Sequence, residues 1–175
     1  MSLTLTVPDA EAARELGRRL ATVLRAGDLV LLSGDLGAGK TTLTQGIGSG
    51  LGVRGQVASP TFIIARVHPA LGDGPDLVHV DAYRLGSLDE VDALDLDTSL
   101  EDSVTVVEWG TGKVEALAED RLEIEIRRPR GEGFSAAGSE LAELAAPAPR
   151  EVVVEGLGAR WAEVDLGRHL LAAPA

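Results

Sequence analysis

The segment at residues 34–41 constrains the fold of this chain more than any other. Its sequence, GDLGAGKT, matches the phosphate-binding loop pattern G-x-x-x-x-G-K-[ST] at every fixed position. The apolar run at residues 28–33 before it is typical of a buried parallel strand, and residues 42–47 after it can form a helix. A helix there points its free N–H groups at the loop. The segment therefore predicts a strand, a loop and a helix that bind phosphate groups.

The residues of this loop have separate tasks. Its glycines let consecutive backbone N–H groups turn inward around phosphate oxygens. Lys40 is expected to reach the β- and γ-phosphates of a nucleotide, and the Thr41 hydroxyl to ligate Mg²⁺. The chain has only two lysines, Lys40 and Lys113, against fourteen arginines. In so arginine-rich a sequence, a lysine here indicates that the position needs a compact, flexible point charge.

Two later apolar segments end in an acid: residues 77–81 end at Asp81 and residues 104–108 end at Glu108. P-loop enzymes need a carboxylate at a strand end to hold Mg²⁺, and often a second group to orient the attacking water. Both acids qualify by position. Their spacing leaves open which of them holds metal and which prepares water.

Three further features each have two interpretations. The loop SPTF at residues 59–62 can fold over the γ-phosphate or form an ordinary turn into a strand. Arg84 can act as an arginine finger in cis, although such an arginine more often pairs with an acid. Trp109 can pack over the site or fill the core. The histidines lack metal-ligand spacing and are interpreted as structural: His68, His79 and His169.

The remaining pattern predicts an α/β protein with a P-loop NTPase-like, mostly parallel sheet flanked by helices, plus short antiparallel additions. We expect one domain over residues 1–175. Residues 129–149, rich in Gly, Ala, Pro and Ser, are predicted to be a flexible insertion within it. Further strands are predicted at 3–7, 61–67, 122–126 and 152–154, and helices at 10–25, 88–96 and 114–118.

Composition narrows the function classes. The net charge of −12 argues against a broad nucleic-acid surface, and the absence of cysteine excludes disulfides and thiolate metal sites. No apolar stretch approaches the roughly 18 residues of a membrane span, and the N-terminus lacks a secretory signal. We therefore expect a cytoplasmic protein without a membrane role. Residues 89–102 carry seven acids and no base. This stretch can be a solvated face or a docking surface for a basic partner.

Four motifs resemble one family: residues 34–42 (GDLGAGKTT), 59–62 (SPTF), 79–85 (HVDAYRL) and 107–109 (VEW). In this order and spacing they are similar to the TsaE (YjeE) family, bacterial ATPases for threonylcarbamoyladenosine modification of tRNA. The resemblance covers roughly residues 8–128. It implies a small P-loop α/β domain, ATP and Mg²⁺ as cofactors, and the TsaB and TsaD proteins as partners.

The resemblance also implies roles for individual residues. Asp81 is the acid tied to hydrolysis, with Thr61 as the other catalytic residue, and Thr41 and Glu108 bind Mg²⁺. Arg150 corresponds to an arginine near the nucleotide in the family. The expected nucleotide-binding residues are Gly34, Leu36, Gly37, Ala38, Gly39, Lys40, Thr41, Thr42, Trp109 and Arg150.

The expected function is Mg²⁺-dependent ATP hydrolysis that is slow alone and harnessed by a partner complex. ATP is favoured because the sequence has no Asn/Thr-Lys-x-Asp run of the kind that reads guanine. One alternative is a small-molecule kinase, with a lid drawn from Arg127, Arg128 and Arg130. Another is a binding module that uses nucleotide as a conformational ligand with negligible turnover. Direct tRNA binding is not expected, because the acidic chain has no aromatic and basic platform for bases.

Overall fold

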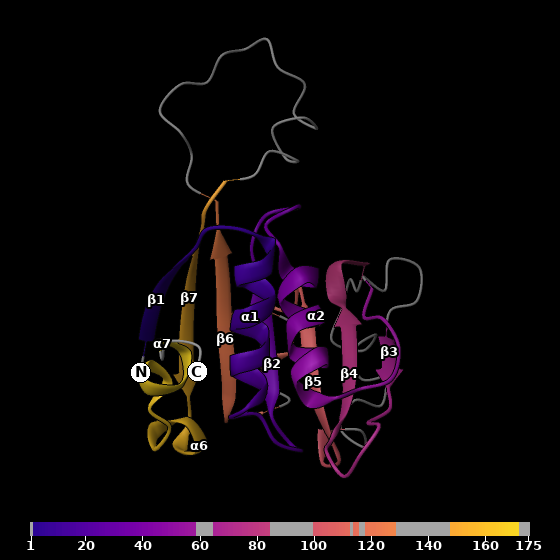
Figure 1. The fold of residues 1–175 in the computed structure, drawn as a ribbon. Coiled ribbons are helices and arrows are strands. Elements are labelled where there is room, and N and C mark those ends of the chain that lie inside the picture. The colour runs from indigo at the N-terminus through magenta and orange to yellow at the C-terminus, as the bar shows by residue number, and fades with distance from the viewer. Residues whose placement is uncertain are drawn as a thin grey trace.

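The computed structural model describes residues 2–58, 65–84, 100–112, 114–115, 118–128 and 148–171. Seven strands form one sheet in the order β1-β7-β6-β2-β5-β4-β3 (Figure 1). The strands are β1 (Ser2–Val7), β2 (Leu29–Ser33), β3 (Ala65–His68), β4 (Asp76–Asp81), β5 (Ser103–Glu108), β6 (Arg121–Arg127) and β7 (Arg150–Leu157). The helices are α1 (Ala10–Ala21), α2 (Lys40–Leu51), the 3₁₀ turn η1 (Ala82–Arg84), α6 (Ala159–Ala162) and α7 (Leu166–Leu171).

The centre of the sheet is parallel and its edges are antiparallel. β2 pairs in parallel with β5 and β6, and β5 pairs in parallel with β4. β3 runs antiparallel to β4, while β7 and β1 complete the other edge in antiparallel fashion. The predicted fold class is therefore confirmed. The parallel strands all end on the same side of the sheet. In folds of this type, ligands bind beside these carboxyl ends.

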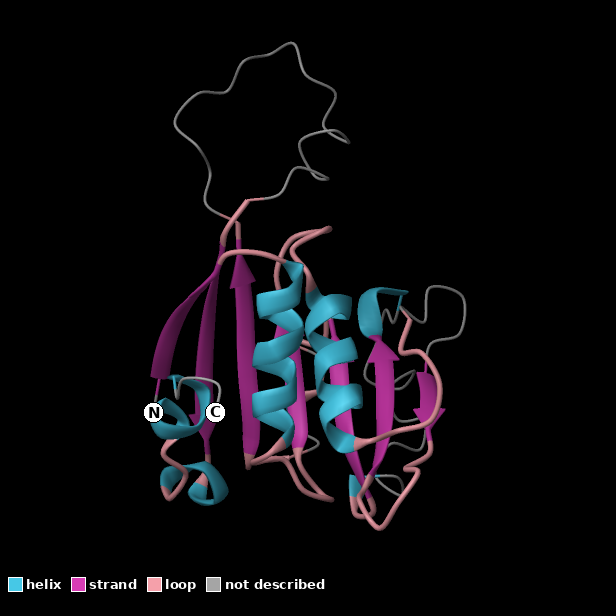
Figure 2. Ribbon diagram, in the orientation of Figure 1, coloured by secondary structure: helices cyan, strands magenta, loops and turns pink. Residues whose placement is uncertain are grey.

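The sheet is covered differently on its two faces. Helices α1 and α2 lie side by side across one face, as Figure 2 shows, and α6 and α7 add to the same apolar core. A smaller core on the other face gathers around Leu31, Val80 and Val107. β2 is buried on both faces from Leu29 to Leu32, as a central parallel strand requires. The strand that carries the phosphate-binding loop is thus held from both sides.

Helix α1 begins as predicted and ends earlier than predicted. Asp9 caps its start, with Oδ1 accepting a hydrogen bond of 2.8 Å from the Ala12 N–H. The helix ends at Ala21 rather than at residue 25. The Thr22 N–H and hydroxyl both donate to the Arg19 carbonyl, which closes the last turn. Asp28 then accepts from the Arg25 N–H at 2.9 Å, so the chain turns before β2.

Several predicted segments fall outside the described residues. These are the loop at 59–62, the first part of the strand predicted at 61–67, the helix at 88–96, parts of the helix at 114–118 and nearly all of 129–149. Much of the acidic stretch at 89–102 also lies there. Among the described residues, no helix is both long and apolar enough to cross a membrane.

Helices α1 and α2 pack with their backbones in direct contact at Gly17. A Cβ atom there would overlap the Leu43 carbonyl oxygen and lie 2.7 Å from the Ile47 N atom, both in α2. Gly46 of α2 is equally constrained, because a Cβ there would overlap the Arg14 carbonyl oxygen. Only glycine fits at these two positions without separating the helices.

We expect Gly17→Ala to destabilise the protein by about 1–3 kcal/mol, because the methyl group overpacks a backbone contact. For a chain of this size that corresponds to a melting temperature lower by roughly 2–4 °C per kcal/mol. Gly72→Ala is the matched control, since a Cβ there meets nothing within 4 Å. Equal melting temperatures for the two variants in a thermal denaturation would contradict the packing argument.

Candidate active site

The loop between β2 and α2 is shaped by glycines at positive φ. Gly34, Gly37 and Gly39 have φ angles of 140°, 76° and 110°. Other residues rarely adopt such angles, and a Cβ on Gly34 would also overlap the Ile126 carbonyl oxygen. The Ala38 N–H donates to the Asp35 carbonyl at 3.0 Å, which closes the turn. Lys40 follows as the first residue of α2. The predicted strand, loop and helix are confirmed.

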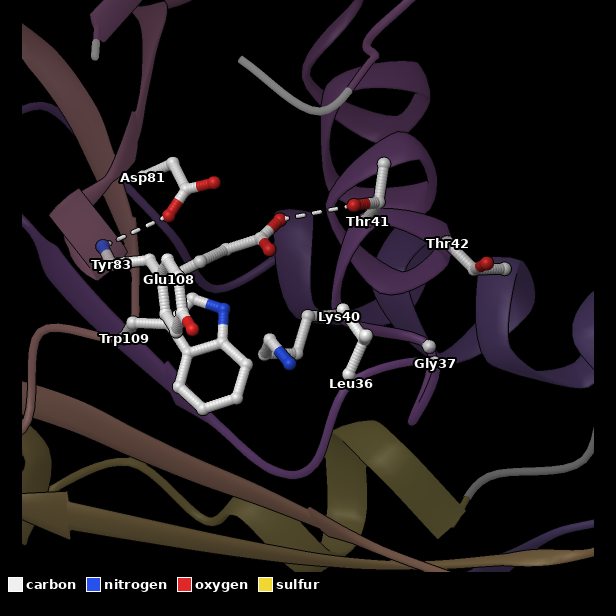
Figure 3. A pocket seen from close by; sticks show the side chains of 10 residues that line it. Leu36, Gly37, Lys40, Thr41, Thr42, Asp81, Tyr83, Glu108 and Trp109 are labelled. Carbon is white, nitrogen blue, oxygen red and sulfur yellow. Dashed lines mark hydrogen bonds between the residues drawn. The ribbon is translucent and has the colours of Figure 1, made fainter. Parts of the chain in front are cut away.

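A cavity of about 530 Å³ lies beside this loop. It is bordered by the loop, the start of α2 and the ends of β4 and β5 (Figure 3). Nine of the residues singled out from the sequence meet there: Leu36, Gly37, Gly39, Lys40, Thr41, Thr42, Asp81, Glu108 and Trp109. Tyr83, 68% exposed, completes the lining. Sequence reasoning missed it as a site residue, although it stands two residues after Asp81.

Of the four other expected residues, three lie elsewhere in the described structure. Gly34 borders a neighbouring cavity, and Ala38 is buried within the loop. The Arg150 guanidinium does not line the cavity, but its Nε atom donates to the Ala38 carbonyl at 3.2 Å and so contacts the loop from β7. Burial lowers the pKa of Arg150, and the nearby charge of Arg128 lowers it further. Thr61 lies outside the described residues, as does the side chain of Arg84.

Thr41 and Glu108 form a hydrogen-bonded pair. The Thr41 hydroxyl donates to the Glu108 Oε1 atom at 3.2 Å (Figure 3), and Glu108 is only 3% exposed. A hydroxyl that donates its proton to a carboxylate keeps its oxygen lone pairs free for a cation. Oxygen ligands of this kind suit Mg²⁺, which binds through few protein groups plus phosphates and water.

Asp81 lies directly beside Glu108, because the two residues are register partners at the ends of β4 and β5. Its Oδ1 atom accepts a hydrogen bond of 3.0 Å from the Tyr83 N–H. That bond fixes one side of the carboxylate and leaves the Oδ2 atom for another partner. The structure thus brings together the two acids that the sequence placed at separate strand ends.

The Lys40 ammonium is buried against the loop. It donates to the carbonyl oxygens of Gly34 at 2.8 Å and Asp35 at 3.0 Å, and it lies 4.0 Å from the centre of the Trp109 ring. A cation over an aromatic face is attracted by the ring quadrupole. Burial lowers the pKa of Lys40, while the charges of Glu108, Asp81 and Asp35 oppose that shift. A positive charge is therefore held at the wall of the cavity.

Trp109 adopts an unusual backbone conformation. Its φ angle of 61° is the only positive value at a non-glycine residue in the described part of the chain, and it costs roughly 1–2 kcal/mol. The Trp109 N–H donates to the Leu32 carbonyl at 3.1 Å, which extends the pairing of β5 with β2. The ring packs edge-on against Tyr83 at 5.4 Å. Of the two interpretations left open, the one in which Trp109 packs over the site agrees with the structure.

His79 is the main residue that sequence reasoning missed. The sequence predicts only a structural role for it, yet its Nε2 atom lies 2.8 Å from Glu108 Oε1, and the side chain is completely buried. The signal was a polar residue inside an apolar strand, two positions before Asp81 and therefore on the same face of β4.

Across the described residues, no group of three or more His, Cys, Asp and Glu side chains could hold a metal ion.

Comparisons with known proteins agree on one family. The profile of the family described as "Threonylcarbamoyl adenosine biosynthesis protein TsaE" matches residues 7–134. The tRNA threonylcarbamoyladenosine biosynthesis protein TsaE of Streptomyces coelicolor is 66% identical over 154 residues, covering 87% of this chain and 96% of that protein. The protein of the same name from Bacillus subtilis is 37% identical over 163 residues, covering 91% and 90%.

A solved structure supports the same assignment. The crystal structure of Bacillus subtilis YdiB superposes with a TM-score of 0.65 at 31% identity, and covers 93% of this chain and 90% of that one. The relatives have similar lengths and the same fold, and the family profile spans most of the chain. The chain belongs to the TsaE family of tRNA threonylcarbamoyladenosine biosynthesis.

Proposed function

We propose that this protein hydrolyses ATP with Mg²⁺ at the cavity beside the phosphate-binding loop, in support of threonylcarbamoyladenosine modification of tRNA. One observation carries the proposal: a buried lysine, a threonine paired with a carboxylate and a second carboxylate all face one cavity at the start of α2. Phosphoryl transfer on P-loop folds needs this set to position the phosphates and neutralise their charge.

The roles of the side chains follow from their positions. The N–H groups of the loop and the start of α2 bind phosphate oxygens, and Lys40 supplies a positive charge to the β- and γ-phosphates. Thr41 and Glu108 would hold Mg²⁺, whose positive charge would offset the charge that develops on the phosphate oxygens. Asp81, with Oδ2 free of its bond to Tyr83, accepts a hydrogen bond from the attacking water. Thr61 is proposed as a second catalytic residue on the family resemblance alone.

The nucleotide contacts extend around the loop. Leu36, Gly37, Gly39 and Thr42 line the cavity, while Gly34, Ala38 and Arg150 are proposed to act by holding the loop in shape. Trp109 is proposed to cover the bound nucleotide next to Lys40. The preference for ATP over GTP rests on the absence of a guanine-reading motif in the sequence, and tighter binding of GTP in a direct titration would contradict it.

The partner proposal rests on charge and family. The chain carries a net charge of −12, so phosphate backbones are repelled rather than attracted. We infer that TsaB and TsaD handle the tRNA and transfer the threonylcarbamoyl group, while ATP turnover here supports their cycle. Recovery of both proteins in an affinity purification from the native cell supports this view. Tight, salt-sensitive tRNA binding by the purified chain alone would overturn it.

Phosphate release tests the reaction itself. Purified protein with γ-³²P-ATP is expected to release labelled phosphate slowly, and faster when TsaB and TsaD are added. Transfer of the label to a metabolite would indicate a kinase. Of the three arginines considered for a kinase lid, Arg127 pairs with Glu125 and Glu151 at the surface of the sheet. If phosphate release is no faster than in buffer, even when the partners are present, the protein would instead be a nucleotide-dependent binding module.

The metal ligands give a second test. We expect Thr41→Ala and Glu108→Ala each to weaken Mg²⁺ binding to the nucleotide complex by about 10- to 100-fold, the usual cost of disturbing a metal site. Nucleotide binding without metal should stay close to that of the unsubstituted protein, because neither side chain provides the main phosphate contacts. Calorimetric titration of Mg²⁺ into the ADP complex measures the effect. Glu163→Ala, which removes an exposed acid at the C-terminal end of α6, is the matched control.

A further inference from the structure

The environment of Glu108 contains a donor that the proposed mechanism does not use. His79 reaches Glu108 from β4, while Thr41 reaches it from α2, and both bond to the same oxygen, Oε1. The two bonds measure 2.8 Å for His79 and 3.2 Å for Thr41. The carboxylate is therefore anchored from a strand and from a helix at once.

The position of His79 follows from the register of the sheet. Asp81 pairs with Glu108 across β4 and β5, and His79 pairs with Val106 two residues earlier. Side chains two residues apart on a strand share a face, so His79 lies on the face of β4 that carries Asp81, two residues earlier in the strand, and is completely buried there. It is not among the residues that line the cavity. Among the described residues, its hydrogen-bond contact with the site is the one to Glu108.

The imidazole offers one nitrogen to the site. A carboxylate can only accept, so Nε2 must carry a hydrogen to make the bond. The other nitrogen, Nδ1, is buried with no hydrogen-bond partner among the described residues. A hydrogen on Nδ1 would be buried without an acceptor, which is costly. The geometry therefore selects the tautomer with the hydrogen on Nε2.

We propose that His79 is a positioning residue that holds the Glu108 carboxylate in the orientation needed for the Mg²⁺ site. A free glutamate side chain has several rotatable bonds, and fixing it before nucleotide arrives removes that cost from metal binding. Hydrogen bonds to metal-binding carboxylates commonly act in this way. The inference rests on the proposed function, since it assigns Glu108 to Mg²⁺.

Substitutions that separate donor from volume test this role. His79→Leu keeps the apolar bulk and removes the donor, and we expect the Kd for Mg²⁺ in the ADP complex to rise about 10- to 100-fold. His79→Gln retains an N–H at the end of a side chain of similar reach, and should recover most of the affinity. Binding of ADP without metal should not change in either variant. A side chain that only fills the core would give the same Mg²⁺ affinity in both.

His68→Leu provides the matched control. His68 is also a buried histidine, on the neighbouring strand β3, and its Nε2 atom also has no partner among the described residues. It makes no contact with Glu108 in the described hydrogen bonds, so its replacement should leave the Mg²⁺ affinity unchanged. A loss in His68→Leu equal to that in His79→Leu would overturn the proposal, because it would reflect general damage to this part of the sheet.

A spectroscopic measurement keeps the proposal testable if His79→Leu fails to fold. Nitrogen-15 NMR of the unsubstituted protein should show the His79 ring with its hydrogen on Nε2, and Glu108→Gln should shift that signal more than the His68 signal. A hydrogen on Nδ1 would overturn the proposal. The proposed function and the role of His79 give different results in these experiments. If the unsubstituted protein shows no Mg²⁺-dependent nucleotide binding, the proposed function fails; if it does and His79→Leu matches it, the role of His79 fails.

Discussion

Replacing Lys40 with alanine is expected to remove most nucleotide binding, by at least about 100-fold, since hydrogen bonds to charged groups contribute up to about 3 kcal/mol each. Lys40 is only 5% exposed, and among the described residues that line the cavity its side chain is the only cation. Without it, Asp81 and Glu108 would leave the cavity negative and repel phosphate. Titration with a fluorescent ADP analogue measures the loss.

Two variants sharpen this experiment. Lys40→Arg keeps the charge but replaces a compact ammonium with a planar fork, so it should recover only part of the affinity. Arg14→Ala removes a cation on α1 that pairs with Glu11 at the surface, and should leave binding unchanged. ADP binding by Lys40→Ala as tight as that of the unsubstituted protein would refute the assignment of this cavity to phosphate.

Asp81→Ala is expected to spare nucleotide binding and to lower the rate of hydrolysis by roughly 100-fold, the scale of general-base catalysis. The reason is geometric: Asp81 lies next to Glu108 but makes no described bond to Thr41, so it is not tied to the metal pair. Asp81→Asn is the sharper variant. Its side-chain oxygen can still accept from the Tyr83 N–H, while the amide cannot accept a proton from water. Single-turnover phosphate release, compared with equilibrium ADP binding, separates the two effects.

The same experiment decides between the two acids. Sequence spacing left their roles open, and the bond from Thr41 to Glu108 favours Glu108 as the metal ligand. If Asp81→Ala removes Mg²⁺ binding while Glu108→Ala leaves it intact, the two roles are reversed. Asp81 would then be the Mg²⁺ ligand, and Glu108 would be the acid that acts in hydrolysis.

What the sequence predicted was mainly local. The strand, loop and helix around Lys40 follow from a short motif and the apolar pattern beside it, and the start of α1 follows from its apolar periodicity. The end of α1 was misplaced, because the apolar stripe continues through Val23 and Leu24 while the backbone turns under hydrogen bonds from Thr22 and to Asp28. Apolar periodicity does not reveal such competing bonds.

What the sequence could not predict depends on strand pairing. Asp81 and Glu108 are neighbours only because β4 and β5 pair in one particular register. The contact between His79 and Glu108 depends on the same register, so an isolated histidine gave no sign of its partner. The ring of Trp109 reaches Lys40 through a backbone angle that residue type alone does not indicate. Each of these is a long-range contact, set by the assembled sheet.

The glycine contact between α1 and α2 has a consequence for how this family can diverge. Lys40 is the first residue of α2, so the helix that carries it is held in place by the backbone of α1, which supplies none of the described residues that line the cavity. A relative with a larger side chain at the position of Gly17 must move the two helices apart, and would carry its phosphate site away from β2 in the same step. Substitution at this position is therefore coupled to the geometry of the loop, and the backbone contact with α2 limits which residues α1 can carry there.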